Sequence, residues 1–169
     1  MRRSVIISAC ALAWSASHTP AQTPPAEPPR HVIEQPSPEA AAAERARFSA
    51  EVAKLIAGRE QEKAETVFKN IQFFKGVPAG RLVKIMEMGF ARSLGVGCTH
   101  CHVEGAWEKD DKPQKQIARE MGAMARAIGT DYLAKIKNLA SSEPTVNCTT
   151  CHRGQIKPAL DLGPPGPSR

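Results

Sequence analysis

Aromatic side chains are scarce in this chain of 169 residues: five Phe, two Trp and one Tyr make up 5% of it. The chain also lacks any long run in which Val, Ile, Thr or Tyr alternates with polar residues, the pattern of a half-buried strand. A core built from these side chains alone would be thin. The composition therefore favours helices packed around additional apolar material, and we expect an all-α fold.

Runs of like charge are missing as well. The formal net charge is +6, yet no stretch of five or more charges of one sign occurs. Without a leader that contains Arg2 and Arg3, 21 of the 23 basic residues remain against 17 acidic ones, which gives +4. Long basic runs are typical of nucleic-acid-binding tails. We therefore expect no nucleic-acid partner.

Cysteines for structural disulfides are lacking too. Four of the five cysteines lie in two five-residue motifs, CTHCH at 98–102 and CTTCH at 148–152, and the fifth is Cys10. The spacing C-x-x-C-H is typical of covalent c-type haem attachment. Two thiols at this spacing can form thioethers on one porphyrin edge, and the adjoining histidine can ligate the iron. We predict two covalently bound haem c groups, held by Cys98, Cys101, Cys148 and Cys151, with His102 and His152 as iron ligands.

Paired cysteines have two other common uses. A structural zinc site would gather all four motif cysteines around one ion, but both trailing histidines would then be coincidental. A thioredoxin-like dithiol would lie in a βαβ pattern, and no such pattern surrounds either pair. Haem attachment explains more of the motif than either alternative.

No apolar run is long enough to span a membrane. Residues 1–21 combine a basic start, a short apolar stretch from Val5 to Trp14 and small residues that suit cleavage, which is typical of a secretory signal peptide. We expect an exported, periplasmic protein without a stable membrane span, associated with a membrane at most peripherally. Whether Cys10 carries a lipid is left open.

Proline and glycine divide the remainder of the chain. Residues 22–38 are rich in proline and predict an extended tether, residues 39–157 form the expected dihaem domain, and residues 158–169 form a flexible tail. Within the domain, Ser37 and Pro38 predict the start of a helix over 39–59. An irregular apolar segment over 64–76 and a helix over 79–94, with Pro78 at its first position, come next. Another helix is expected from 114 to about 140.

Apart from Met1, every methionine lies in one of the two helices that precede the motifs. In the first helix, Met86 shares an apolar stripe with Leu82 and Phe90, whereas Met88 lies on the charged side. Met86 is therefore the expected second ligand of the first iron, with Met88 as the runner-up. In the second helix Met121 and Met124 share the inward stripe, and spacing alone does not choose between them.

Four segments together resemble a known family: VFKNIQFFKGVPAGRL, SLGVGCTHCHV, DDKPQKQIAREMGAMARAIG and CTTCHRG. They are similar to the cytochrome c subunit of photosynthetic reaction centres and its dihaem relatives, over about residues 66–155. The resemblance implies a mostly helical fold in which a helix offers an axial methionine and the following CxxCH holds the haem. Its Met-x-Arg pattern implies Met124 rather than Met121. At the first site the implied methionine, eleven residues before the cysteine, falls on Glu87.

The expected function is electron transfer without catalysis. Irons ligated by His and Met on opposite sides have no open position, and methionine raises the potential. We expect an electron carrier between redox proteins, which include membrane-associated complexes. The alternative is a dihaem peroxidase or reductase subunit, in which neither Met86 nor Met88 ligates the first iron.

Overall fold

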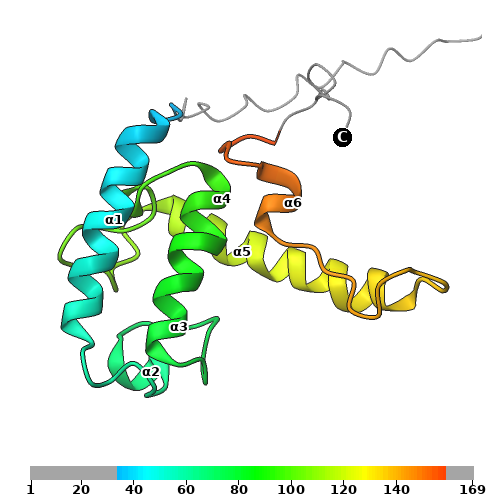
Figure 1. The fold of residues 1–169 in the computed structure, drawn as a ribbon, viewed down its shortest axis with the longest axis horizontal. Helices are drawn as coiled ribbons and strands as arrows, with labels where there is room; N and C mark the ends of the chain where they lie inside the picture. The colour runs from blue at the N-terminus through cyan, green and yellow to red at the C-terminus, as the bar shows by residue number, and fades with distance from the viewer. Residues whose placement is uncertain (1–33, 159–169) are drawn as a thin grey trace, which may run out of the picture. The chain divides into compact units, whose positions relative to one another are not determined.

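A computed structural model describes residues 34–158 of the protein (Figure 1). Backbone contacts divide the chain after Val32, and the described residues all belong to the second unit. Within residues 34–158 the regular elements are helices, and only two isolated β-bridges occur. The predicted signal peptide with Cys10, the first part of the tether and the tail from residue 159 lie outside the described residues.

Helix α1 spans Pro38–Leu55 and begins as the sequence predicts. The Ser37 side chain accepts a hydrogen bond from Ala40 N at 3.2 Å, and Pro38 fills the first turn, where no backbone donor is required. The helix buries Ala41 and Phe48 and ends a few residues earlier than expected. The ordered chain also begins before residue 39, because Gln35 is hydrogen-bonded to distant segments.

The apolar segment after α1 is not wholly irregular. Ala64–Val67 form the single turn α2, and the chain then runs without regular structure through Asn70, which has a left-handed φ of 58°. The rings of Phe73 and Phe74 meet edge to face at 5.0 Å. This segment brings its aromatic side chains to the helix that follows, since Phe74 contacts Phe90 at 6.0 Å.

The helix predicted over 79–94 is continuous but not uniform. It consists of α3 (Ala79–Lys84), the π-helical segment η1 (Ile85–Ala91) and α4 (Arg92–Leu94). Pro78 is the N-cap, with extended backbone, and not the first helical residue as predicted. Gly95 ends the helix with a left-handed φ of 67°, as glycine readily does. The π segment matters for the first site because it contains Met86 and Glu87.

The second long helix is shorter than predicted. Helix α5 spans Pro113–Ala127, and the π segment η3 (Ile128–Tyr132) and the 3₁₀ turn η4 (Leu133–Lys135) follow it. Ile136 is extended, and Lys137 and Asn138 then form a turn in which Asn138 has a left-handed φ of 63°, so the expected continuation to about residue 140 is wrong. Gly129, Thr130 and Asp131 are all poor helix formers, which accounts for the loss of regular α-helix there.

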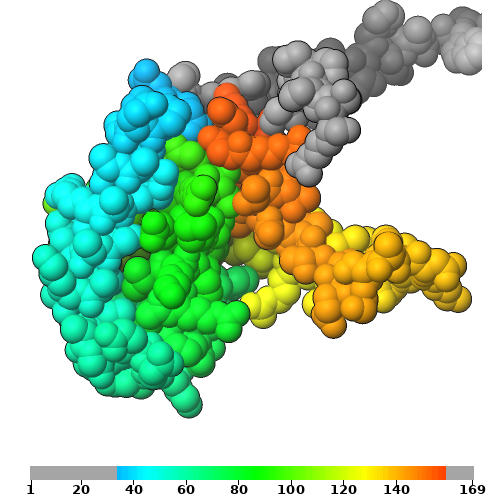
Figure 2. Space-filling model, in the orientation of Figure 1, coloured from blue at the N-terminus to red at the C-terminus, as the bar shows by residue number. Residues whose placement is uncertain are grey.

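The two motifs form short helical turns, and the second packs against the helix before the first. Cys98–His100 form the 3₁₀ turn η2, and Cys148–His152 form α6. Helices α4 and α6 lie side by side, as Figures 1 and 2 show. The hydroxyls of Ser93 and Thr149 lie 2.6 Å apart, and Gly154 N donates to Ser93 O at 2.8 Å. A Cβ on Gly95 would lie 2.1 Å from Gly154 O, so this close approach requires glycine.

Candidate cofactor sites

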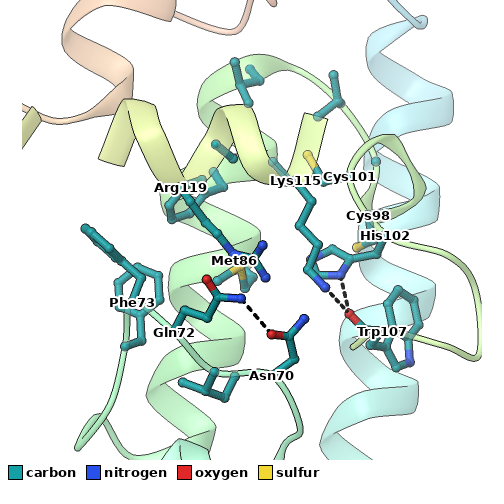
Figure 3. Close-up of a pocket in the computed structure, with 18 of the residues that line it drawn as sticks. Asn70, Gln72, Phe73, Met86, Cys98, Cys101, His102, Trp107, Lys115 and Arg119 are labelled. Atoms are coloured by element: carbon teal, nitrogen blue, oxygen red, sulfur yellow. Dashed lines mark hydrogen bonds between the residues drawn. The ribbon is translucent and has the colours of Figure 1, made fainter. Parts of the chain in front are cut away.

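The first motif lies against a cavity with an empty volume of about 900 Å³, which includes space open to solvent. Four parts of the chain line it: the segment 69–74, the helix 79–94, the first motif and α5 (Figure 3). Most of the lining side chains are apolar. Among the residues that line it are Phe73, Met86, Phe90, Cys98, Cys101 and His102.

His102 is held by its own downstream loop. Its Nδ1 lies 2.9 Å from Trp107 O, and its ring meets the Trp107 indole at 5.9 Å. A carbonyl oxygen only accepts, so Nδ1 carries the proton in this contact and Nε2 remains free to bind a metal. Burial lowers the pKa of His102, which favours the neutral, ligating form. The indole in turn packs on Phe48 of α1 at 5.0 Å.

Met86, Glu87 and Met88 have different surroundings. Met86 lines the first cavity and also an adjoining one that His102, Trp107 and Cys98 border. Met88 is half exposed, and its sulfur lies 3.7 Å from Arg92 Nη1. Glu87 borders the adjoining cavity and accepts a hydrogen bond from Ser49 Oγ at 3.1 Å. Of the two methionines, only Met86 therefore shares a cavity with the first motif.

The first cavity has a polar end. Asn70, Gln72 and Arg119 line it there, and Gln72 Nε2 donates to Asn70 Oδ1 at 2.8 Å (Figure 3). Arg119 Nη2 also donates to Asp110 Oδ1 at 2.9 Å. Three donors, with Arg119 the largest influence, hold the pKa of Asp110 well below its usual range.

The first pair of cysteines is unbridged and partly buried. Burial raises the pKa of the Cys98 thiol and that of Cys101 to about 11. Both thiols are therefore protonated at neutral pH, and neither is set up as a reactive thiolate. The shift disfavours a dithiol redox centre at this position.

The second motif lies against a second cavity, with an empty volume of about 1050 Å³ that again includes open solvent. Cys148, Cys151 and His152 line it from α6, while Met121 and Met124 line it from α5. His152 repeats the arrangement of His102, since its Nδ1 lies 3.0 Å from Gln155 O. Met121 and Met124 are 37% and 46% exposed, so burial does not choose between them.

Both cavities are bordered by the same four residues: Phe90, Leu94, Cys101 and Ala118. His100, in the middle of the first motif, lines the second cavity and not the first. His100 is half-buried there, and burial lowers its pKa. The two sites are immediate neighbours.

The four motif cysteines are not gathered into one site. Across residues 34–158, no three side chains of His, Cys, Asp or Glu form a group that could hold a metal ion, whereas the zinc alternative requires the four cysteines to meet. In the same residues, no helix is both long and apolar enough to cross a bilayer.

Two residues of these sites carried no clear signal in the sequence. Trp107 lies in a polar loop, and only the structure shows that its carbonyl and ring both contact His102. Lys115 belongs to no motif, yet it is 9% exposed and hydrogen-bonds the loop that holds His102.

Comparison with known proteins supports a single family. Residues 27–160 match the family described as the photosynthetic reaction centre cytochrome c subunit. The chain is 35% identical over 111 residues to the photosynthetic reaction center cytochrome c subunit of Thermochromatium tepidum, which covers 63% of this chain and 26% of that protein. It is 30% identical over 83 residues to cytochrome c-554 of Chloroflexus aurantiacus, and this match covers 49% of the chain and 20% of that protein. The matched part thus spans about a fifth to a quarter of the length of these relatives.

Proposed function

Because the chain belongs to the family of photosynthetic reaction centre cytochrome c subunits, we propose that it is an exported dihaem cytochrome that carries electrons between redox proteins. The observation that carries the proposal is the repeated site: two cysteines, a histidine with Nε2 free and a methionine border one cavity, twice over. The members of this family are electron-transfer cytochromes and not enzymes. The peroxidase or reductase alternative has no such support.

The residues present fit a covalently attached haem at each site. Each cavity is largely apolar, as a porphyrin requires, and the first has a polar end at Asn70, Gln72 and Arg119 that suits propionates. Cys98 and Cys101 would hold the first haem and Cys148 and Cys151 the second. When bound, each haem supplies an iron that cycles between the ferric and ferrous states.

The axial ligands we propose are His102 with Met86, and His152 with Met124. Met86 is favoured over Met88 because it borders the first cavity. Met124 is favoured over Met121 by the family's Met-x-Arg pattern alone. The protein's own contribution is to orient the histidines through Trp107 O and Gln155 O, and to exclude water with apolar lining.

Electron exchange between the two sites follows from their shared border. Phe90, Leu94, Cys101 and Ala118 contact both cavities, so no further layer of protein separates the cofactors they would enclose. An electron entering at one site could therefore leave from the other. A carrier with two adjacent sites can connect a donor and an acceptor that dock on different faces.

The partners we propose are a redox donor and a redox acceptor, including membrane-associated complexes, as the relatives' names suggest. We place the protein in the periplasm, with residues 1–21 as its signal peptide. The proline-rich segment that follows would act as a tether that ends before Gln35, which is hydrogen-bonded to the domain. Photosynthesis is not part of the proposal, since this chain has two haem motifs and matches only a portion of the photosynthetic subunit.

Mass spectrometry of the mature protein, produced in a host that matures c-type cytochromes, tests the proposal directly. We expect the mass of the processed chain plus two haems, and a ferric spectrum with the methionine-to-iron charge-transfer band. A protein without covalent haem would refute the function. High-spin ferric iron with peroxide turnover would instead support the enzyme alternative.

A further inference from the structure

The Trp107 carbonyl receives two donors, and electron transfer as proposed above makes no use of the second. His102 Nδ1 lies 2.9 Å from the oxygen, and Lys115 Nζ lies 3.0 Å from it (Figure 3). A carbonyl oxygen has two lone pairs and can accept from both. The ammonium is the stronger donor, since charge-assisted hydrogen bonds are roughly twice as strong as neutral ones. The hydrogen bond from His102 to this carbonyl is therefore weaker than it would be if the carbonyl accepted from His102 alone.

Lys115 is fixed in this position. It is 9% exposed, and its Nζ also lies 2.9 Å from Glu108 O and 2.7 Å from Lys109 O. Its charge is balanced only in part: Asp110 Oδ1 lies 3.0 Å from it but also 2.9 Å from Arg119 Nη2. Because this one carboxylate is shared between two cations, the charge of Lys115 is only partly neutralised.

On the premise of the proposed function, we propose that Lys115 is a positioning residue that raises the reduction potential of the first haem. The step concerned is the one-electron reduction of ferric to ferrous iron, with the electron supplied by a redox partner or an electrode. A strong Nδ1–H···O=C bond makes a ligating histidine more basic and stabilises ferric iron. Lys115 weakens that bond, and its positive charge favours the ferrous state, so both effects have the same sign.

The second site provides an internal comparison. His152 Nδ1 lies 3.0 Å from Gln155 O, and within residues 34–158 no lysine or arginine donates to that carbonyl. The second histidine thus has the same backbone partner without the competing ammonium. The effect of Lys115 is therefore specific to the first haem.

Redox titration of the full-length holoprotein tests this role. In Lys115→Met, the ratio of ferric to ferrous first haem at a fixed potential should rise at least tenfold, which is 59 mV for one electron. The second haem is identified as the titration step that is missing from the Cys148→Ala/Cys151→Ala protein. Its ratio of ferric to ferrous iron should change less than twofold. Lys112→Met is the matched control: Lys112 donates to the Thr99 carbonyl and should change the ratio less than threefold. Lys115→Arg keeps the positive charge and a hydrogen-bond donor, so the reduction potential of its first haem should stay close to that of the unmodified protein.

The Asp110→Asn substitution leaves Lys115 in place and should shift the reduction potential of the first haem in the opposite direction. Removing that carboxylate charge should raise the first potential, whereas a merely structural role predicts no such reversal. The inference is overturned if Lys115→Met, with both haems attached, leaves the first potential unchanged or shifts both haems equally, or if Lys112→Met has the same effect. It is also overturned if Asp110→Asn lowers that potential. Absence of covalent haem in the unmodified protein would refute the proposed function, which mass spectrometry distinguishes from these outcomes.

Discussion

At the scale of single residues, a neighbour in sequence can have a different role in the structure. Met86 and Met88 are two positions apart, but one borders the first cavity and the other contacts Arg92 on the surface. Glu87, where the family resemblance implies the ligand, is instead hydrogen-bonded to Ser49. The choice of axial ligand at the first site therefore reduces to a comparison of two methionines.

Replacement of Met86 by alanine should open the first iron. Because no other described methionine borders that cavity, we expect the reduced Met86→Ala protein to bind one carbon monoxide per chain, where the unmodified protein binds none. Optical titration with carbon monoxide measures this. Met88→Ala is the matched control and should leave the spectrum unchanged; carbon monoxide binding by the control alone would assign the ligand to Met88.

The second iron offers an equivalent pair. Met121 and Met124 both line the second cavity, and only the family pattern favours Met124. We expect Met124→Ala to bind carbon monoxide at the second haem and to lose one methionine-to-iron band, while Met121→Ala retains both bands. The opposite result would transfer the ligand to Met121.

At the scale of elements, the helix before the first motif contains a departure from α-helix that the sequence pattern did not predict. The segment η1 (Ile85–Ala91) is π-helical, and its i→i+5 bonds hold about one more residue per turn than an α-helix. The family resemblance puts the methionine one residue closer to the cysteine than Met86 is. The π segment can absorb that extra residue and keep Met86 directed at the cavity.

Deletion of Gly89 tests this explanation. The helix should become a regular α-helix, with Met86 at the spacing the family shows, and the methionine-to-iron band of the first haem should persist in the optical spectrum. Gly89→Ala, whose Cβ would lie an ordinary 3.7 Å from Ile85 Cγ2, should also retain it. Loss of the band in the deletion but not in the substitution would show that the π segment does not compensate for spacing.

The contact between α4 and α6 depends on one glycine. In Gly95→Ala the new Cβ would combine left-handed strain with a 2.1 Å approach to Gly154 O, and we expect a loss of about 3 kcal/mol or more in the free energy of unfolding. Gly58→Ala is the control: φ is +82° there and nothing lies within 4 Å, so strain alone should cost about 1–2 kcal/mol. Denaturant unfolding of the holoproteins measures both, and equal losses would contradict a steric role for Gly95.

At the scale of the whole molecule, the two sites share a wall. Both cavities are bordered by Phe90, Leu94, Cys101 and Ala118. We therefore expect the loss of one cofactor to change the properties of the other site. Cys148→Ala/Cys151→Ala should retain a single haem and expose Phe90 and Leu94 to solvent. We expect a lower thermal midpoint and a changed first potential, measured by calorimetry and redox titration; retention of two covalent haems would refute the attachment proposal.

Local features were predictable from the sequence, and long-range ones were not. The cap at Ser37 and the end of the helix at residue 94 depend on residues within one turn, so both were predictable from the sequence. The haem motifs are equally local. The π segment, the burial of Lys115 and the position of His100 depend on contacts with residues far along the chain, which periodicity does not contain. The early end of α5 was predictable only in part. Gly129 indicates that the helix is weak there, but it does not indicate the residue at which the helix ends.

The hydrogen bonds of Gln35 connect the start of the described chain to its end. Its Nε2 donates to Leu94 O at 3.1 Å and Gly95 O at 3.0 Å, while its Oε1 accepts from Ile156 N at 2.8 Å, across 121 positions. Contacts of such sequence separation form late in folding, because the intervening loop must close first. A chain that emerges N-terminus first cannot complete this clasp until the second motif has also emerged. The contacts of Gln35 are therefore completed only in a chain in which both CxxCH motifs are already present.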